Sequence, residues 1–273
     1  MVLKDRTAVI YGGGGAIGGA VASAWAEAGA RVHLAGRSRA RLDAVAEEID
    51  AAGVAEVDAR DARAVADHAA AVAAEDGGID VVLNAVSFPF VHDRPLAEVE
   101  VDDVLHPIEA YVRTNLVTAK AVAPHMAARG SGAILTLSAG ASRVVPPGSL
   151  GYGTACATVE TLTQRLAVEL GPSGVRVVCL RPHLISDAPA QGSYTRDLVA
   201  RRAAAAGVDV DEWFARWAED VTLLGRLPTL AQVAEAATFL ASDRAAAITG
   251  AVIDLTCGNA LRTRAGALVG VLD

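Results

Sequence analysis

The chain has 273 residues, 52% of them hydrophobic, which fits one large α/β domain better than two small ones. A net charge of −8 at pH 7, without clustered Lys or Arg, argues against a nucleic-acid partner. Cys156, Cys179 and Cys257 form no CxxC pair, so neither a disulfide framework nor a metal site is expected. No signal-peptide core and no membrane-length apolar run is found, so we expect a cytoplasmic protein with no membrane partner.

Strand-like β-branched runs alternate with alanine-rich helical runs, which predicts a Rossmann-like, doubly wound parallel sheet of about seven strands with helices on both faces. The strands are expected at 7–11, 31–35, 54–57, 79–84, 132–137, 175–180 and 251–255. Helices are expected at 16–28, from Ser38 to about 52, at 61–75 and at 152–170. Gly29 can end the first helix in the left-handed conformation, Ser38 can cap the second, and Pro107 is expected to start a new helical segment inside 101–129. The sequence therefore predicts a single domain over 1–273.

A glycine-rich run follows the first predicted strand and leads into a helix. Gly12 permits a tight turn, Gly14 and Gly15 let phosphates approach the backbone, and Gly18 lets the helix pack closely on the strand. The backbone N–H groups near Ile17 and the positive helix end would face a pyrophosphate. This run predicts a dinucleotide site, although any glycine-rich turn between a strand and a helix can look similar.

The end of the second predicted strand bears on the choice of cofactor. A carboxylate there would bind the ribose hydroxyls and repel a 2′-phosphate, whereas Gly36, Arg37 and Ser38 offer space and a positive charge. This favours NADP(H) over NAD(H). The alternative is that Arg37 is a solvated charge at a helix start.

From about Leu3 to Asn259 the chain resembles the short-chain dehydrogenases/reductases. The glycine run is similar to the TGxxxGxG loop of that family, with Tyr11 for Thr and Ala16 for the middle Gly. Further matching positions are Asp58 and Ala59 at the adenine contact, Asn84 and Ala85 in the turn after the fourth strand, Asn115 in the proton relay, and Pro182 beside the nicotinamide. Such an ordered series is specific for the fold and much less so for the reaction.

The resemblance implies a catalytic tyrosine, a lysine four residues later and a serine about thirteen residues earlier. Tyr152 is present, but Cys156 replaces the lysine, and Ala139 holds the serine position with Ser138 one place off. A tyrosine with a pKa of about 10 and no adjacent ammonium is a poor general base, but its phenol can still donate a proton. Cys156 is a packed thiol or a nucleophile, and Ser138 either takes the serine role or makes a local hydrogen bond.

Other departures follow the sixth predicted strand. His183 replaces the glycine of the Pro-Gly pair, and Asp187 replaces the threonine that grips the nicotinamide carboxamide in the resembling family. These two residues form a new acid/base pair, or they mark drift in a segment that hydride transfer no longer uses. His92 and His106 border the pocket or are surface and packing residues.

An insertion at about 187–223 is expected to cover the pocket as a lid. Its Trp213 and Trp217, together with Phe88 and Phe90, imply a sizeable apolar substrate, unless the tryptophans simply pack on the body or on another subunit. A tail at 260–273 is expected to pack across the interface of a homodimer or homotetramer.

Three functional hypotheses remain. The first is an atypical NADP(H)-dependent oxidoreductase acting on an apolar carbonyl or alcohol, with Tyr152 as proton donor and Asn115 holding a water. The second is a non-redox cyclase, isomerase or lyase on the same scaffold, in which His183 or Tyr152 moves a proton. The third is a non-catalytic partner subunit.

Overall fold

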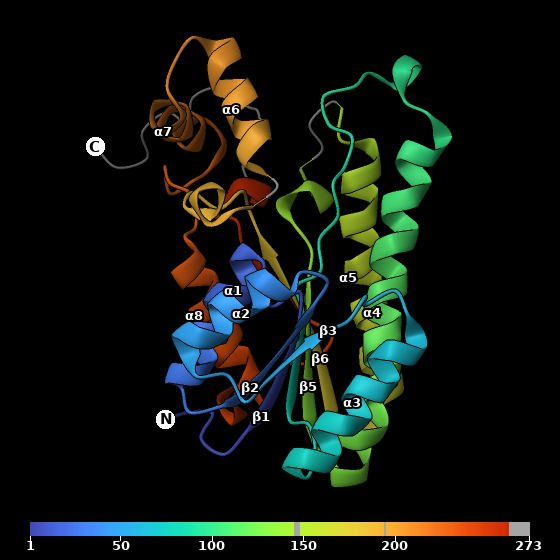
Figure 1. Cartoon of the computed structure of the whole chain (residues 1–273). Helices are drawn as coiled ribbons and strands as arrows, with labels where there is room; N and C mark the ends of the chain where they lie inside the picture. The colour runs from blue at the N-terminus through green and yellow to red at the C-terminus, as the bar shows by residue number, and fades with distance from the viewer. Residues whose placement is uncertain (145–147, 194, 262–273) are drawn as a thin grey trace, which may run out of the picture.

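Seven parallel strands form one sheet in the order β3-β2-β1-β4-β5-β6-β7 (Figure 1). The computed structural model of the chain describes residues 1–144, 148–193 and 195–261. The strands are β1 (Thr7–Tyr11), β2 (Arg31–Gly36), β3 (Gly53–Glu56), β4 (Val81–Asn84), β5 (Gly132–Leu137), β6 (Val175–Pro182) and β7 (Val252–Leu255). The predicted Rossmann-like α/β fold is confirmed, with strand boundaries that differ from the expected ones by two residues or fewer.

Helices cover both faces of the sheet: α1, α2 and α8 on one side and α3, α4 and α5 on the other (Figure 1). Their bounds are α1 (Ala16–Glu27), α2 (Arg39–Ile49), α3 (Ala62–Asp76), α4 (Val101–Arg129), α5 (Leu150–Leu170) and α8 (Leu230–Ala241). Two further helices, α6 (Thr195–Ala206) and α7 (Val210–Val221), lie together at one end of the molecule, apart from these layers.

The core is divided by the sheet because successive strand residues point to opposite faces. In β1, Ala8 and Ile10 pack with Trp25 of α1, whereas Val9 and Tyr11 pack against the layer that holds α3 and α4. Every residue of β1 is buried, as expected for a central parallel strand covered on both faces.

Strand order reverses between β1 and β4, which are direct neighbours. In sheets of this kind the crevice beyond the carboxyl ends of the strands at the switch point is where ligands bind. Both the glycine-rich turn after β1 and the turn after β4 begin there. The fold thus brings the predicted cofactor residues to one edge.

Helix α4 corrects one sequence expectation. Pro107 does not start a new segment, because α4 runs unbroken from Val101 to Arg129 with Pro107 and Pro124 inside it. The helix begins before Pro107 at a capping box formed by Glu100 and Asp103, and this cap overrides the proline signal. Helix α8 was not predicted from the sequence, although Thr229 and Gln232 form another capping box at its start.

Of the two residues expected at helix ends, Gly29 and Ser38, only the first behaves as predicted. Gly29 adopts a φ of 96° just after α1, as predicted for a left-handed helix end. Ser38 occupies the N-cap of α2 without making a side-chain cap hydrogen bond. No helix in the described part of the chain is long and apolar enough to cross a bilayer.

Candidate active site

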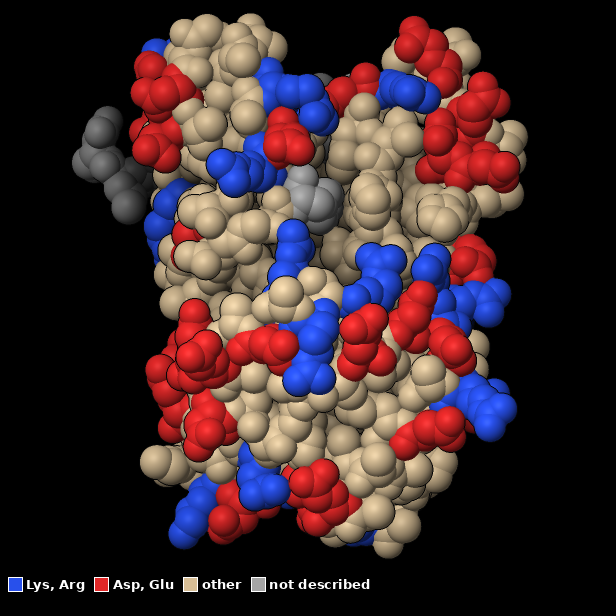
Figure 2. Space-filling view, in the orientation of Figure 1, with Lys and Arg blue, Asp and Glu red and all other residues tan. Residues whose placement is uncertain are grey.

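A cavity of about 1320 Å³ opens at the carboxyl edge of the sheet, between the α6–α7 end of the molecule and the upper ends of α4 and α5 (Figure 2). It exceeds the roughly 300–1,000 Å³ of a typical small-ligand pocket and so has room for a dinucleotide with a second ligand. Predicted site residues that line it are Gly12, Gly14, Gly15, Ile17, Arg37, Ser38, Asp58, Ala59, Ala85, Ser138, Tyr152, Pro182 and His183. Gly18, Asn84 and Asn115 are not part of its lining.

The glycine-rich turn has no room for side chains. Gly12 has a φ of 88°, and a Cβ there would lie 2.6 Å from the backbone of Ala85. A Cβ on Gly18 would lie 2.2 Å from the carbonyl oxygen of Gly12, which explains how Gly18 acts without reaching the cavity. The first turn of α1 holds no acidic residue, so its unpaired N–H groups and positive end are free to bind an anion. This cradle fits a pyrophosphate.

The end of the cavity beyond β2 is positively charged. Arg37, Ser38 and Arg41 all line it, and Gly36 leaves space beside them. Asp58 lines the same end, but its carboxylate accepts hydrogen bonds from the backbone and side chain of Arg60, with Nη2 at 2.8 Å. These hydrogen bonds from Arg60 lower the pKa of Asp58, so its charge is fixed and balanced.

The two family asparagines lie behind the lining. Asn84 accepts a hydrogen bond from the Val86 N–H at 3.1 Å and donates to Thr118 at 3.1 Å, which ties the turn after β4 to α4. Asn115 donates to the carbonyl of Tyr111 at 2.9 Å. Its Oδ1 is buried and accepts no hydrogen bond within the described residues.

Tyr152 lies in an aromatic wall near the start of α5. Its ring centroid is 4.6 Å from that of Phe90 and 5.6 Å from that of His92. Phe88 is buried against Tyr111, with ring centroids 5.6 Å apart. His92 thus borders the pocket, as one interpretation expected, whereas His106 is exposed on α4. Burial lowers the pKa of His92, and Arg202 adds to that effect.

Cys156 lines the cavity one helical turn beyond Tyr152 and is 1% exposed. Burial raises the pKa of its thiol to about 12, although the Tyr152 side chain and the Ala139 backbone act in the opposite direction. A thiol that stays protonated at neutral pH is a weak nucleophile, which supports the packed-thiol interpretation. Lysine occurs only at positions 4 and 120, and both side chains are exposed, so no other lysine takes the place that Cys156 holds.

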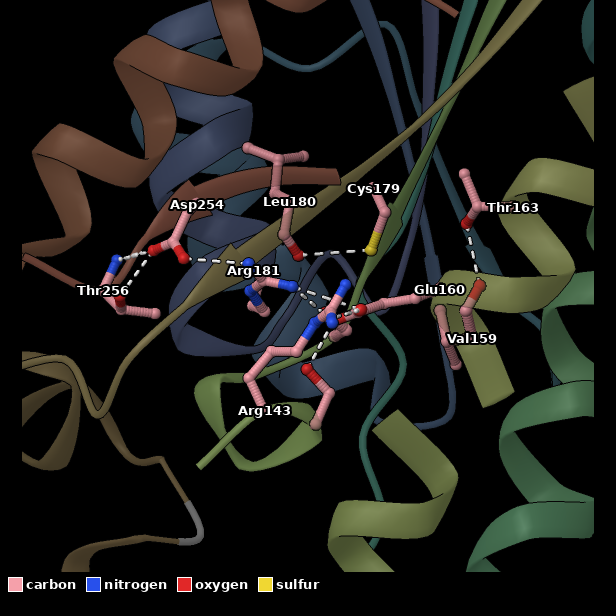
Figure 3. Close-up of polar contacts among 11 residues, drawn as sticks. Arg143, Val159, Glu160, Thr163, Cys179, Leu180, Arg181, Asp254 and Thr256 are labelled. Atoms are coloured by element: carbon pink, nitrogen blue, oxygen red, sulfur yellow. Dashed lines mark hydrogen bonds and ion pairs between the residues drawn. The ribbon is translucent and has the colours of Figure 1, made fainter. Parts of the chain in front are cut away.

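Glu160, eight residues beyond Tyr152 on α5, belongs to a charge network that the sequence did not predict (Figure 3). Glu160 of α5 accepts a hydrogen bond from Ser138 at 3.0 Å and another from Ser142. It also pairs with Arg181 of β6 at 3.2 Å, and Arg181 reaches Asp254 of β7 at 2.9 Å. The Ser138 hydroxyl donates to Glu160, which lies 22 residues further along the chain, so its partner is neither the backbone next to it nor a group that the sequence indicated.

Sequence reasoning missed the network because each member is ambiguous alone. Glu160 follows Cys156 by four residues and Tyr152 by eight, so all three share one face of α5. A carboxylate on an otherwise buried helix face needs a partner, and Arg181 at the end of a buried strand is the matching anomaly. That pair of anomalies is the signal by which the sequence could have revealed the contact.

His183 and Asp187 do not form an acid/base pair. Asp187 accepts a hydrogen bond from the Leu230 N–H at the start of α8, at 2.9 Å. His183 Nδ1 accepts one from the Leu184 N–H at 2.7 Å, and burial lowers the pKa of His183 to about 4. His183 is therefore neutral at physiological pH with its proton on Nε2, which makes it a hydrogen-bond donor.

The insertion at 187–223 contains α6 and α7, and residues of both line the cavity. Trp213 and Trp217 stack with ring centroids 5.1 Å apart, and Trp217 meets His183 at 4.9 Å. Arg202 of α6 pairs with Asp93, the neighbour of the lining residue His92, at 2.8 Å. Both tryptophans pack on the body of the protein beside Leu184 and Leu227, and Trp217 also lines the cavity. The tail at 260–273 lies almost wholly outside the described residues.

Comparisons with known proteins show the family to which the chain belongs. Residues 14–259 match the family described as Enoyl-(Acyl carrier protein) reductase. A galactitol 2-dehydrogenase (L-tagatose-forming) of Cereibacter sphaeroides is 31% identical over 269 residues, which is 94% of this chain and 95% of that protein. An uncharacterized oxidoreductase of Staphylococcus aureus is 31% identical over 189 residues, 68% of this chain and 81% of its own.

Solved structures share the fold. NAD+-bound xylitol dehydrogenase has a TM-score of 0.83 at 21% identity and covers 94% of this chain and 100% of its own. A short-chain type dehydrogenase/reductase from Mycobacterium ulcerans has a TM-score of 0.80 at 26% identity, covering 96% and 92%. The chain therefore belongs to the short-chain dehydrogenase/reductase superfamily of oxidoreductases, which bind NAD(P)(H).

Proposed function

We propose that the protein is an atypical NADP(H)-dependent oxidoreductase that acts on an apolar carbonyl compound or its alcohol, with Tyr152 as the proton-transferring group. The observation that carries this proposal is that Tyr152 lines the same cavity as the glycine cradle and Arg37. A cofactor on the cradle and a substrate against the aromatic wall would then meet within one cavity.

The preference for the phosphorylated cofactor rests on charge. Arg37 and Arg41 line the cavity beyond β2, and the carboxylate of Asp58 is already occupied by Arg60. Two guanidinium groups favour NADP(H), because they form charge-assisted hydrogen bonds with its 2′-phosphate. The neutral ribose hydroxyls of NAD(H) would bind them less strongly. The NAD+ of the xylitol dehydrogenase structure belongs to that protein, and its 21% identity carries no cofactor choice to this chain.

The chemistry assigned to the chain's own residues follows from their surroundings. When bound, NADPH would supply the hydride. The Tyr152 phenol donates its proton to the oxygen of the carbonyl as negative charge develops there. Phe90 and the lid helices exclude water, and Asn115 holds a water through its unpaired Oδ1. With Cys156 in place of lysine, no ammonium from this position stabilises a phenolate, so reduction is favoured over alcohol oxidation.

A fluorescence titration with NADPH tests the first step, with NADH run in parallel. We expect NADPH to bind at least about tenfold more tightly, since each charge-assisted hydrogen bond contributes about 1.5–3 kcal/mol. Absence of NADPH binding would contradict the proposal. Consumption of NADPH with a panel of hydrophobic ketones, such as 1-tetralone and 1-decalone, then tests the redox step.

A second function is supported by the resemblance, which aligns Cys156 and Ala139 with the family's lysine and serine. These changes suit a non-redox cyclase, isomerase or lyase that uses the same cavity to shape its substrate. Tyr152 would then move a proton with no change in the cofactor. Product formation without NADPH consumption distinguishes this enzyme from the reductase.

We further propose a cytoplasmic homodimer or homotetramer built on α5 and the adjoining α4. The outward surfaces of these helices expose Leu105, Leu116 and Val168, which a second subunit would cover. The free thiols of Cys156, Cys179 and Cys257 support a reducing compartment. Light scattering coupled to gel filtration tests the assembly, and a monomer at micromolar concentration would contradict it.

A further inference from the structure

The positively charged end of the cavity has a largely apolar corner around Asp58. Tyr11, Val57 and Val86 pack in one hydrophobic cluster and line the cavity, and so does the buried Ala59. We call these four residues and Asp58 the Asp58 corner. Apolar walls with few polar groups suit the flat faces of a heterocyclic base.

The position of Arg37 connects this corner with the proposed cofactor. Arg37 lines the cavity and lies close enough to Asp58 for its charge to help lower the pKa of that carboxyl. In a 2′-phosphorylated nucleoside the phosphate and the base are attached to neighbouring carbons of the ribose. A phosphate bound at Arg37 therefore directs its base toward the Asp58 corner.

The carboxylate of Asp58 is fully used by one residue of the chain. The backbone N–H of Arg60 donates to Oδ1 at 2.9 Å, and its Nη2 donates to Oδ2 at 2.8 Å. Its Nε lies 3.2 Å from both oxygens. An ionised carboxylate offers about four lone-pair sites, and these four contacts occupy them. Asp58 has no acceptor left for an N–H of a ligand.

Arg60 is held well enough to keep this place when a nucleotide binds. Its guanidinium carbon lies 5.9 Å from the centre of the Phe88 ring, on which it makes a cation–π contact. The amino group of adenine is a neutral donor, and hydrogen bonds between two charged groups are stronger than those with one. The base therefore does not displace Arg60 from Asp58.

Tyr11, the other polar side chain of the corner, is also paired within the protein. Its hydroxyl lies 3.1 Å from Nδ1 of His68, and the two rings meet edge to face. Burial raises the pKa of Tyr11 and lowers that of His68 to about 4, so both side chains are neutral at pH 7. Both polar side chains of the Asp58 corner thus have partners in the chain itself.

We propose that Arg60 is a specificity-determining residue: by occupying Asp58, it makes the Asp58 corner accept a purine nucleotide whether or not its base carries a 6-amino group. Affinity then comes from the phosphates and from apolar contacts with the faces of the base. This inference deepens the proposed function and rests on it for the nucleotide. Without Arg60, the carboxylate of Asp58 would select for the amino group of adenine.

The test compares two ligands by isothermal titration calorimetry, without nicotinamide and without turnover. They are adenosine 2′,5′-bisphosphate and purine riboside 2′,5′-bisphosphate, in which a hydrogen atom replaces the 6-amino group. We expect the unchanged protein to bind the two with affinities within about twofold of each other, because no hydrogen bond distinguishes them.

Variants identify Arg60 as the cause. Arg60→Leu frees Asp58, so it should favour the adenosine compound by about fivefold or more, the effect of one hydrogen bond. Loss of the positive charge weakens both ligands alike, so the ratio of affinities is the readout. Arg60→Ala should give the same ratio, and adding Asp58→Ala to Arg60→Leu should remove the preference.

Arg63→Leu is the matched control, because it removes the same charge from the same region. Arg63 pairs with Asp67 on the exposed side of α3 and does not line the cavity. Its ratio of affinities should equal that of the unchanged protein. Thermal unfolding of each variant checks the fold.

The outcomes separate this inference from the proposed function. A preference of the unchanged protein for the adenosine compound by about fivefold or more would overturn the role of Arg60, because an acceptor would then remain available. Equal binding of the two ligands by Arg60→Leu would overturn it as well. Failure of the unchanged protein to bind either bisphosphate or NADPH would instead overturn the proposed cofactor.

Discussion

The two ends of the cavity are built in different ways. Around α1 the wall is mostly backbone: Gly12 and Gly18 have no room for side chains, and the helix end provides the positive potential. Around Tyr152 the wall consists of side chains, among them Phe88 and Cys156. A backbone wall tolerates few substitutions without losing its ligand, whereas a side-chain wall can exchange its chemistry while the fold persists. The proposed function accordingly assigns cofactor binding to the backbone end and the departures from the superfamily's chemistry to the side-chain end.

Gly18→Val should have the largest effect and would destroy the backbone end. Its Cβ would lie 2.2 Å from the Gly12 carbonyl oxygen, so the turn must move away from the phosphates. We expect NADPH affinity to fall at least about a hundredfold, more than 2.7 kcal/mol, in a fluorescence titration. Gly171→Ala is the matched control, because a Cβ there meets nothing within 4 Å. Unchanged affinity in Gly18→Val would show that the cradle does not hold the cofactor.

Glu160→Leu tests whether the side-chain end depends on its buried charges. Glu160 is 7% exposed and Arg181 is 8% exposed, so removing the carboxylate deprives a buried guanidinium of one partner and leaves it with Asp254. The expected loss of unfolding free energy is about 3–5 kcal/mol, measured by urea denaturation. Glu212→Ala, which breaks the exposed pair with Arg216, should cost less than about 1 kcal/mol.

A double variant tests whether the loss of stability comes from leaving Arg181 with one partner fewer. Glu160→Leu combined with Arg181→Met removes both charges, and it should recover much of the lost stability because a buried ion pair often contributes little over apolar packing. Equal instability in the single and double variants would show that the pair contributes through shape alone.

The variant Cys156→Lys distinguishes a weakened reductase from an enzyme that catalyses a different, non-redox reaction. An ammonium beside Tyr152 would lower the pKa of the phenol and restore the arrangement that the superfamily uses. If the protein is a weakened reductase, NADPH-dependent turnover of a hydrophobic ketone should rise about tenfold to a hundredfold. Cys156→Met, which adds length without charge, is the control. No gain, together with intact NADPH binding, would favour the non-redox enzyme.

The sequence predicted the backbone end of the cavity far better than the side-chain end. Gly12 and Gly18 are informative because only glycine fits their positions, and Arg37 follows directly from the end of β2. Glu160, Arg181 and Asp254 come from three elements far apart in the chain, so their contacts exist only in the folded sheet. Local patterns also failed at Pro107, where the capping box at Glu100 fixes the helix start instead.

His183 shows how the fold changes the meaning of a residue. The sequence left two interpretations of His183 and Asp187 open, a new acid/base pair or drift, because the two replace a glycine and a threonine of the family motif. The structure gives Asp187 to the Leu230 N–H and buries His183 with Nδ1 occupied. The sequence could not distinguish a pair of His183 with Asp187 from the observed contact, because the partner of Asp187 is the start of α8, 43 residues further along the chain.

Arg37→Ser should have the smallest effect and tests selectivity at the backbone end. Loss of the guanidinium removes an attraction for the 2′-phosphate and leaves the pyrophosphate cradle intact. We expect NADPH affinity to fall about tenfold, equivalent to about 1.4 kcal/mol, while NADH affinity stays constant. Arg39→Ser is the control, because Arg39 pairs with Asp43 on α2 and does not line the cavity. Equal losses for both cofactors would mean that Arg37 contacts the shared part of the dinucleotide. In that case Arg37 would contribute to the binding of either dinucleotide without selecting for the 2′-phosphate, and a preference for NADP(H) would have to come from Arg41.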